Sequence, residues 1–190
     1  TMILPILSYG ASVLRQECED FEEHTPLDKL IKDMFETMYA ASGVGLAGPQ
    51  IGVENRIFIL DGSPFAEPDE NEDIDEELLE LKDFKKVFIN PIIENESGDL
   101  WPFSEGCLSI PGIREEVERK SNIKISYFDE NWLFKEETYK GIPARIIQHE
   151  YDHIEGILFT DHLNPLKRRL LKRKLEDISK GKVDVNYKMK

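Results

Sequence analysis

The stretch Gln148 to Gly156, QHEYDHIEG, places two histidines four residues apart with a glutamate between them. On a helix, side chains at i and i+4 project from one face about one turn apart, so His149 and His153 can bind one metal ion. Glu150 can reach a water molecule beside such an ion and move its proton. The motif therefore predicts a hydrolytic metal site. The alternative is an amphipathic helix that carries these histidines without binding a metal. Apolar neighbours favour burial of this helix and argue against that alternative: Ile146, Ile147, Ile154 and Ile157.

A catalytic zinc or iron site usually has three protein ligands and one open position, so a third ligand is expected. The candidates are His162 and Cys107. Cys107 lies in EGCLSIPG (105–112), where Gly106 lets the backbone approach a metal closely, and a thiolate binds borderline divalent ions well. Cys18 has two acidic neighbours, and we interpret it as a free thiol near the surface.

Outward from the motif, the pattern predicts a helix over 144–155, preceded by an antiparallel hairpin of two strands, 123–128 and 132–139. Further strands are predicted at 56–60, 87–90 and 92–93. Upstream, Thr25 followed by Pro26 predicts the start of a helix whose apolar stripe runs from Leu27 to Tyr39 and ends before Gly43. A last helix is predicted over 165–180. These elements predict an α+β fold, with small antiparallel sheets around a central metal-bearing helix, an N-terminal helix and a C-terminal helix.

The charge is unevenly distributed along the chain. The formal net charge is -14, which argues against DNA binding, and ten acids against one base lie between Glu67 and Asp83. We interpret residues 63–83 as an acidic surface insertion in a single domain spanning 1–190. By contrast, the sequence KRRLLKRK (167–174) carries six bases and no acid, and makes the C-terminal helix basic. The absence of a long apolar run predicts no membrane segment, and the two cysteines fit a reducing cytoplasm.

Three segments, GVGLAGPQIG (43–52), EGCLSIPG (105–112) and QHEYDHIEG (148–156), resemble the motifs of the peptide deformylase family in order and approximate spacing. The resemblance implies hydrolysis of the N-terminal formyl group of N-formylmethionyl nascent peptides, which gives formate and a free N-terminal methionine. It implies Cys107, His149 and His153 as metal ligands and Glu150 as the acid/base. Gln50 and the backbone N–H of Leu108 would form the oxyanion hole, consistent with the need of a tetrahedral oxyanion for two donors.

The same resemblance implies the residues that bind the substrate. Glycines on the substrate side would leave room for an extended peptide and for a formyl hydrogen only, while an apolar pocket would take the methionine side chain. Arg114 would meet the substrate backbone. The expected substrate-binding residues are Gly43, Val44, Gly45, Leu46, Gly106, Arg114, Ile142 and Ile146.

For the cofactor, the resemblance implies one divalent ion: Fe²⁺ in the cell, with Zn²⁺, Ni²⁺ or Co²⁺ able to occupy the same ligands in purified protein. It also implies ribosome docking through the basic C-terminal helix. Two alternative functions stay open at this point. One is a zinc endopeptidase ligated through His162, and the other is a non-catalytic, ribosome-associated protein with a structural metal.

Overall fold

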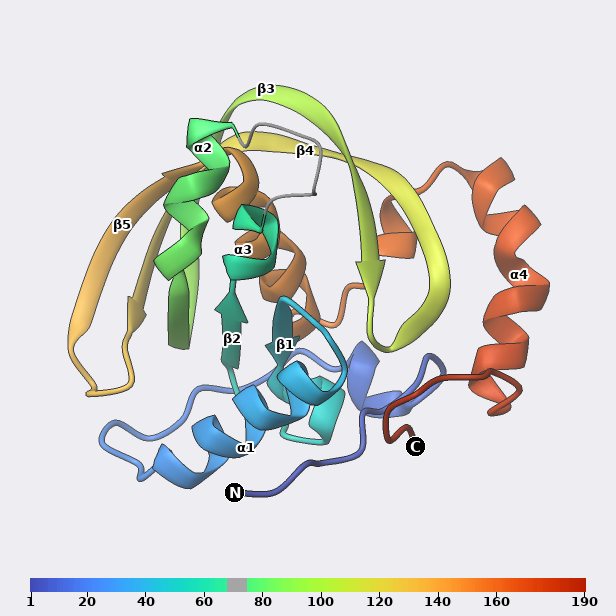
Figure 1. Cartoon of the computed structure of the whole chain (residues 1–190), viewed down its shortest axis with the longest axis horizontal. Helices are drawn as coiled ribbons and strands as arrows, with labels where there is room; N and C mark the ends of the chain where they lie inside the picture. Colours follow the sequence, from blue (N-terminus) through green and yellow to red (C-terminus); the bar gives the residue numbers. More distant parts are fainter. Residues whose placement is uncertain (68–74) are drawn as a thin grey trace.

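A computed structural model describes residues 1–67 and 75–190 (Figure 1). One antiparallel five-stranded sheet has the order β1–β2–β3–β4–β5, so the strands join into a continuous sheet. The strands are β1 (Gly45–Ala47), β2 (Ile57–Asp61), β3 (Lys85–Cys107), β4 (Ile110–Phe128) and β5 (Phe134–Lys140). The longer helices are α1 (Asp28–Ala40), α3 (Gly141–Ile154) and α4 (Pro165–Ser179). The predicted α+β class is confirmed.

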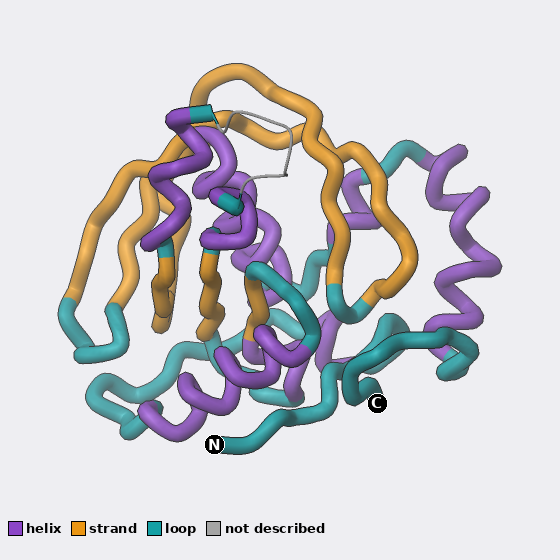
Figure 2. Tube along the Cα trace, viewed as in Figure 1, coloured by secondary structure: helices purple, strands orange, loops and turns teal. Residues whose placement is uncertain are grey.

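Strand β2 lies between two layers of helix, which explains its unbroken apolar sequence. Ile57 and Ile59 pack into a core shared with α1, while Phe58 and Leu60 pack into a second core shared with α3. Successive side chains of a strand point to opposite faces, and a strand covered on both faces needs apolar residues on both. Figure 2 shows α1 and α3 as separate helices near the strands of this sheet.

The hairpin of β3 and β4 is the longest feature of the sheet, and its register shifts four times. Such irregularities bend a hairpin, and Figure 1 shows β3 and β4 arching over the molecule. Only the start of β3, residues 85–89, pairs with β2. The far end of the hairpin, where Cys107 of β3 lies opposite Ile110 of β4, reaches a third core under α4. The bend thus carries Cys107 from the sheet toward α3.

Several predicted boundaries hold and others are corrected. The hairpin of β4 and β5 is confirmed, with Phe128 opposite Phe134. Helix α1 begins at Asp28 and not at Thr25, because the Thr25 hydroxyl donates to the Glu22 carbonyl and caps no helix. Tyr39, the last residue of the predicted apolar stripe, does not share the burial expected of that stripe and is 47% exposed.

Two further corrections concern burial. Cys18, predicted near the surface, is only 6% exposed and packs in the core beside α3, where burial raises the pKa of its thiol to about 11. Within the acidic insertion, residues 68–74 lie outside the described residues. The described parts form η3 (Ser63–Ala66), α2 (Glu76–Leu79) and η4 (Glu80–Asp83), and Leu81 is buried, so the insertion is anchored rather than wholly solvated.

In the described ranges 1–67 and 75–190, no helix combines the length and apolar content needed to cross a membrane.

Candidate metal centre

Helix α3 presents the two histidines of the motif from one face. The ring centroids of His149 and His153 lie 5.2 Å apart and the rings are nearly perpendicular. The helix is fixed by its apolar side, where Ala144, Ile147 and Ile154 are fully buried. The chain leaves α3 at Gly156, whose φ of +76° and close approach to the Arg15 carbonyl exclude a side chain.

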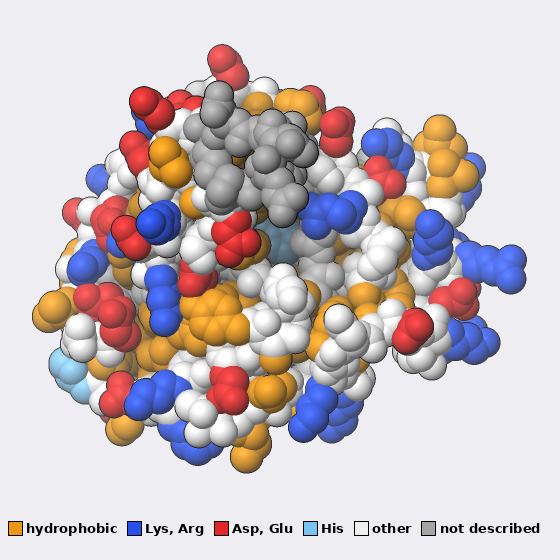
Figure 3. All heavy atoms as spheres, viewed as in Figure 1, with side chains coloured by type: hydrophobic (Ala, Val, Ile, Leu, Met, Phe, Trp, Pro, Cys, Tyr) orange, Lys and Arg blue, Asp and Glu red, His pale blue; other side chains and the backbone are white. Residues whose placement is uncertain are grey.

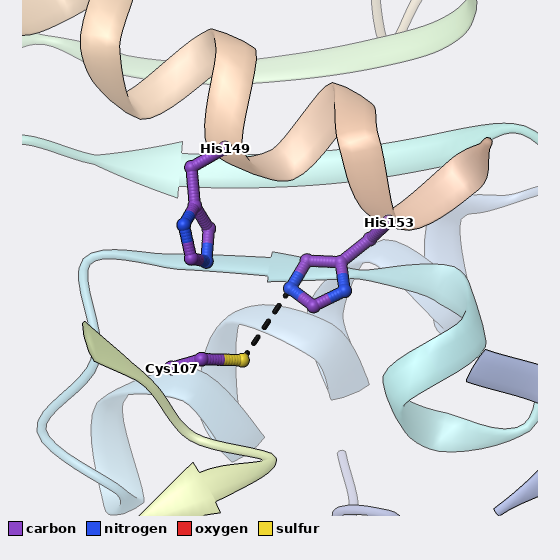
Figure 4. A group of neighbouring side chains, drawn as sticks. All are labelled: Cys107, His149 and His153. Atoms are coloured by element: carbon purple, nitrogen blue, oxygen red, sulfur yellow. Dashed lines mark hydrogen bonds between the residues drawn. The ribbon is translucent and has the colours of Figure 1, made fainter. Parts of the chain in front are cut away.

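Cys107, at the end of β3, faces these histidines (Figure 4). Its Sγ lies 3.4 Å from Nε2 of His153, and one ligand atom from each of Cys107, His149 and His153 lies within 4.8 Å of the others. One thiolate and two imidazoles are a donor set suited to a borderline divalent ion. The three residues therefore fit a metal and leave a position open for water or substrate.

The electrostatics of the cluster favour the form of Cys107 that binds a cation. Burial opposes ionisation of the thiol, but the adjacent imidazoles of His153 and His149 outweigh it and lower the pKa of Cys107 to about 5. A thiolate is the form that coordinates metal. Cys107 is thus poised to bind a cation at neutral pH.

Glu105, two residues before Cys107, holds the His149 ring in place. Its Oε1 accepts a hydrogen bond from Nδ1 of His149 at 2.8 Å, which leaves Nε2 free to face the cluster. Arg119 donates two hydrogen bonds to the same carboxylate, at 2.8 and 2.9 Å, and Arg145 donates a third at 2.8 Å. Although burial opposes it, hydrogen bonds from His149 and Arg119 hold the pKa of Glu105 far below its usual range.

Glu150 is buried beside the cluster. Its Oε1 lies 4.0 Å from Nε2 of His149, and its Oε2 has no hydrogen-bond partner among the described residues. Burial raises the pKa of this carboxyl group. A Cβ atom at Gly45 would lie 2.5 Å from Oε1 of Glu150, so only glycine leaves room for the carboxylate. Glu150 therefore has an unused oxygen and an environment suited to proton exchange.

The side chain of Gln50 is fixed in the same region. Its Oε1 accepts from the backbone N–H of Ala47 at 3.0 Å, which directs Nε2 toward Ser109 Oγ at 3.1 Å and Cys107 Sγ at 3.5 Å. Gln50 is 1% exposed, and η2 (Gly48–Ile51) carries it. An amide donor is therefore fixed next to the metal ligands.

A cavity of about 640 Å³ opens over the cluster. Figure 3 shows a hollow in this face with a histidine at its base. Of the expected substrate-binding residues, six line the cavity: Gly43, Val44, Gly45, Gly106, Arg114 and Ile146. Leu46 and Ile142 lie elsewhere in the described structure, Leu46 fully buried in the core under α1 and Ile142 half-buried against the core beside α3. The cavity is also lined by Phe65, Phe103 and Tyr187, for which the sequence did not indicate any role in the site.

The rival ligand His162 lies outside the cluster. Its Nε2 is 2.8 Å from Oδ2 of Asp152, a carboxylate that also accepts from Arg119 at 2.7 Å. This removes the structural basis of the endopeptidase alternative, which needed His162 as a ligand.

The supporting residues Glu105, Arg119 and Arg145 were also missed. Glu105 lies inside a recognised motif, and a carboxylate so near a ligand is a signal in itself. The two arginines carry no local signal.

An open three-ligand site with a buried glutamate, held between a helix and a bent antiparallel sheet, defines a metal-dependent hydrolase. The sequence model of the polypeptide deformylase family matches residues 3–169. The chain is 55% identical to the peptide deformylase of Christiangramia forsetii, over 100% of this chain and 96% of that protein. The crystal structure of a peptide deformylase from Legionella pneumophila is 37% identical, with a TM-score of 0.78 over 95% of this chain and 97% of that one. The structure of the Thermus thermophilus enzyme is 35% identical, with a TM-score of 0.79 over 94% and 99% of the two chains.

The chain therefore belongs to the polypeptide deformylase family. It is a metal-dependent amidohydrolase that removes N-formyl groups from nascent peptides.

Proposed function

We propose that Cys107, His149 and His153 hold the metal for this reaction, that Glu150 moves the protons, and that Gln50 and the backbone N–H of Leu108 stabilise the oxyanion. The observation that carries the proposal is the meeting of three ligand atoms within 4.8 Å, beside a buried glutamate oxygen that has no partner in the described structure. A divalent ion at these ligands would polarise the formyl carbonyl and make a water molecule more acidic.

Glu150 acts first as the general base and then as the general acid. It takes a proton from the attacking water and later delivers it to the leaving amine, so the free N-terminus and formate leave together. Burial raises the pKa of Glu150, so this carboxylate binds a proton more readily than an exposed glutamate does. Negative charge develops on the formyl oxygen during attack, and Nε2 of Gln50 is a fixed donor near that place.

The cavity supports an extended peptide with one apolar side chain. Gly43 and Gly45 leave the wall beside the ligands free of side chains, and Val44 and Ile146 add apolar surface for the methionine. Gly45 also leaves the Glu150 carboxylate in place, because a Cβ at this position would lie 2.5 Å from Oε1 of Glu150. Arg114 lines the cavity and its Nη2 donates to the Ser104 carbonyl at 3.0 Å, which supports our proposal that it contacts the substrate backbone. Leu46 and Ile142 do not line the cavity, and we propose that they only support the residues that do.

The direct test is release of formate from a formyl-Met peptide by protein prepared anaerobically with iron. Glu150→Gln should keep the metal and lose activity by at least about a hundredfold, while Cys107→Ala should lose both. Metal content, measured beside activity, separates the two variants. Full activity in Glu150→Gln would disprove the assigned proton transfer.

We propose Fe²⁺ as the metal in the cell. The single thiolate and two imidazoles also accept Zn²⁺, Ni²⁺ and Co²⁺, so the ligands alone do not select iron. Metal analysis of protein purified under anaerobic conditions from its own source tests this, and zinc as the predominant metal would contradict it.

We further propose that α4 docks the enzyme on the ribosome, which would place the reaction in the cytoplasm. Lysine and arginine side chains gather at the α4 side of the molecule (Figure 3). Lys167 lies 3.5 Å from Glu115, whereas the other bases of the helix, Arg168, Arg169, Lys172, Arg173 and Lys174, form no ion pair within the described residues. Ribosome co-sedimentation should therefore weaken as salt rises. Replacing Arg169 and Arg173 by glutamate should reduce co-sedimentation without changing the hydrolysis of free peptide.

A further inference from the structure

The C-terminal tail returns to the metal centre. After α4 ends at Ser179, residues 182–190 run back beside the N-terminal segment, as the red and blue ends of the chain show in Figure 1. Backbone hydrogen bonds join Ile6 to Lys188 and Lys190, and Ser8 to Lys190, at 2.8 to 3.0 Å. The tail is therefore anchored by backbone bonds.

The N-terminal segment that pairs with the tail also contacts two segments beside the metal ligands, those of Gln50 and Ser109. The N–H of Leu7 donates to the Gln50 carbonyl at 2.7 Å, and the N–H of Tyr9 donates to the Ser109 carbonyl at 2.9 Å. Tail, N-terminal segment and loops thus form one connected layer beside the cavity.

Tyr187 extends from this tail into the cavity. Its hydroxyl donates a hydrogen bond to the carbonyl of Leu108 at 2.7 Å, and its ring packs on the core under α1. The Leu108 side chain also packs closely on Gly43, where a Cβ would lie 2.7 Å from its Cδ1. Burial is the main reason that the pKa of Tyr187 is raised to about 12, and the charge of the nearby Cys107 adds to it. The phenol therefore keeps its proton.

The contact bears on the two-residue turn that joins Cys107 to Ile110. A short turn has few backbone angles to adjust, so a hydrogen bond to one carbonyl restricts the orientation of the peptide groups beside it. Here those groups lie next to a metal ligand and include the proposed oxyanion donor. Tyr187 lies beyond residue 169, the last residue matched by the family's sequence model, so the tail adds a contact that this model does not cover.

We propose that Tyr187 is a positioning residue for the hydrolysis: its hydroxyl fixes the Leu108 carbonyl and thereby the orientation of the turn between Cys107 and Ile110. The proposal rests on the proposed function in one respect, the role of the Leu108 N–H as an oxyanion donor.

The test compares Tyr187→Phe with Tyr39→Phe in the metal-loaded enzyme. Tyr39 donates a similar phenolic hydrogen bond, to Asp61 at 2.5 Å, but lies outside the cavity. Tyr187→Phe should lower kcat about three- to tenfold, the loss expected for one hydrogen bond, with KM unchanged. Tyr39→Phe should leave both constants unchanged.

Hydrogen exchange at individual amides gives a readout independent of catalysis. In Tyr187→Phe, with or without metal, the amides of Leu108 and Ser109 should exchange faster, while those of α1 should not. Unchanged exchange at the turn would overturn the proposal. Faster exchange with an unchanged kcat would overturn it as well, because the contact would then not serve the reaction.

The proposed function is tested independently of the role of Tyr187. If the parent protein releases formate and Glu150→Gln does not, the assigned chemistry stands whatever Tyr187→Phe does. If Glu150→Gln keeps full activity, that chemistry fails, and the exchange and kcat measurements on Tyr187→Phe still decide the role of Tyr187.

Discussion

Oε1 of Glu105 lies 2.8 Å from Nδ1 of His149, and this one contact joins the metal centre to a buried pair of arginines. The carboxylate fixes which ring nitrogen of His149 faces the cluster, and it forms ion pairs with the two arginines behind it, one of which, Arg119, also pairs with Asp152. Orientation of the ligand and stability of the fold therefore depend on the same side chain.

Glu105→Gln should weaken metal binding about 10- to 100-fold, because the His149 ring loses its charged acceptor. It should also destabilise the protein by about 3–5 kcal/mol, since the buried arginines lose their counter-charge. Metal titration and urea unfolding measure the two effects. Glu115→Gln is the control, because that glutamate forms only a partly exposed pair with Lys167. Wild-type metal affinity in Glu105→Gln would contradict the orienting role.

Gly45→Ala should reduce kcat about 100-fold, the cost of displacing a catalytic group by about 1 Å. The new methyl group would meet Oε1 of Glu150 at 2.5 Å and push the carboxylate from its place. Gly62→Ala is the matched control, because its Cβ would lie no closer than 3.1 Å to its neighbours, the side chains of Leu81 and Phe84, and lies outside the cavity. Equal kinetics for the two variants would show that Glu150 tolerates the displacement.

Gln50→Ala should raise the barrier to hydrolysis by about 2.7–4 kcal/mol if the side chain donates to the oxyanion. The loss should appear in kcat, because charge on the oxygen develops only during attack. Steady-state kinetics with a formyl-Met peptide measure it, with exposed Gln16→Ala as the control. A loss confined to KM would instead assign Gln50 to substrate binding.

Alkylation should distinguish the two cysteines. In metal-free protein at neutral pH, iodoacetamide should modify Cys107, because its pKa of about 5 makes it a thiolate and it lines the cavity. Cys18 should resist, because it is buried and its pKa is about 11. Added metal should protect Cys107. Peptide mass spectrometry locates the label, and modification of Cys18 before unfolding would contradict the structure.

Glu137 should make folding stability depend on pH at the acid end. Burial opposes the shift, but hydrogen bonds from Tyr127 and Tyr139 lower the pKa of Glu137 below its ordinary value of 4.5. The native state then binds protons less readily than the unfolded state, so this contribution is present above pH 4.5 and is lost as the pH falls through the lowered pKa. Urea unfolding from pH 7 to pH 3 should show a smaller loss of stability in Glu137→Gln than in the parent. Parallel curves would refute this assignment.

The sequence predicted the elements whose pattern is local. The stripe of α1, the β4–β5 hairpin and the helix of the histidine motif each show a period or a turn within a few residues. The limits of α1 were less predictable, because Thr25 bonds to a neighbouring carbonyl instead of capping the helix. The arch of β3 and β4 also escaped prediction, since its bends depend on pairing across the hairpin.

The same distinction applies to the site. The metal ligands and Glu150 lie in short motifs and could be named from them. Arg119, Arg145 and Tyr187 reach the site only through tertiary structure, so no local pattern marks them. Cys18 was misplaced for a related reason: acidic neighbours suggested exposure, yet its own side chain points into the core.

The metal ligands Cys107 and His153 are 46 residues apart in the sequence and come from different elements. An ion bound by both residues would therefore also cross-link two distant parts of the chain, and its binding energy would add to the stability of the assembled fold. Because both histidines follow Cys107 in the sequence, the three ligand atoms can meet only once α3 has packed beside β3 and β4. Formation of the metal site therefore requires the assembled tertiary structure and no single element alone.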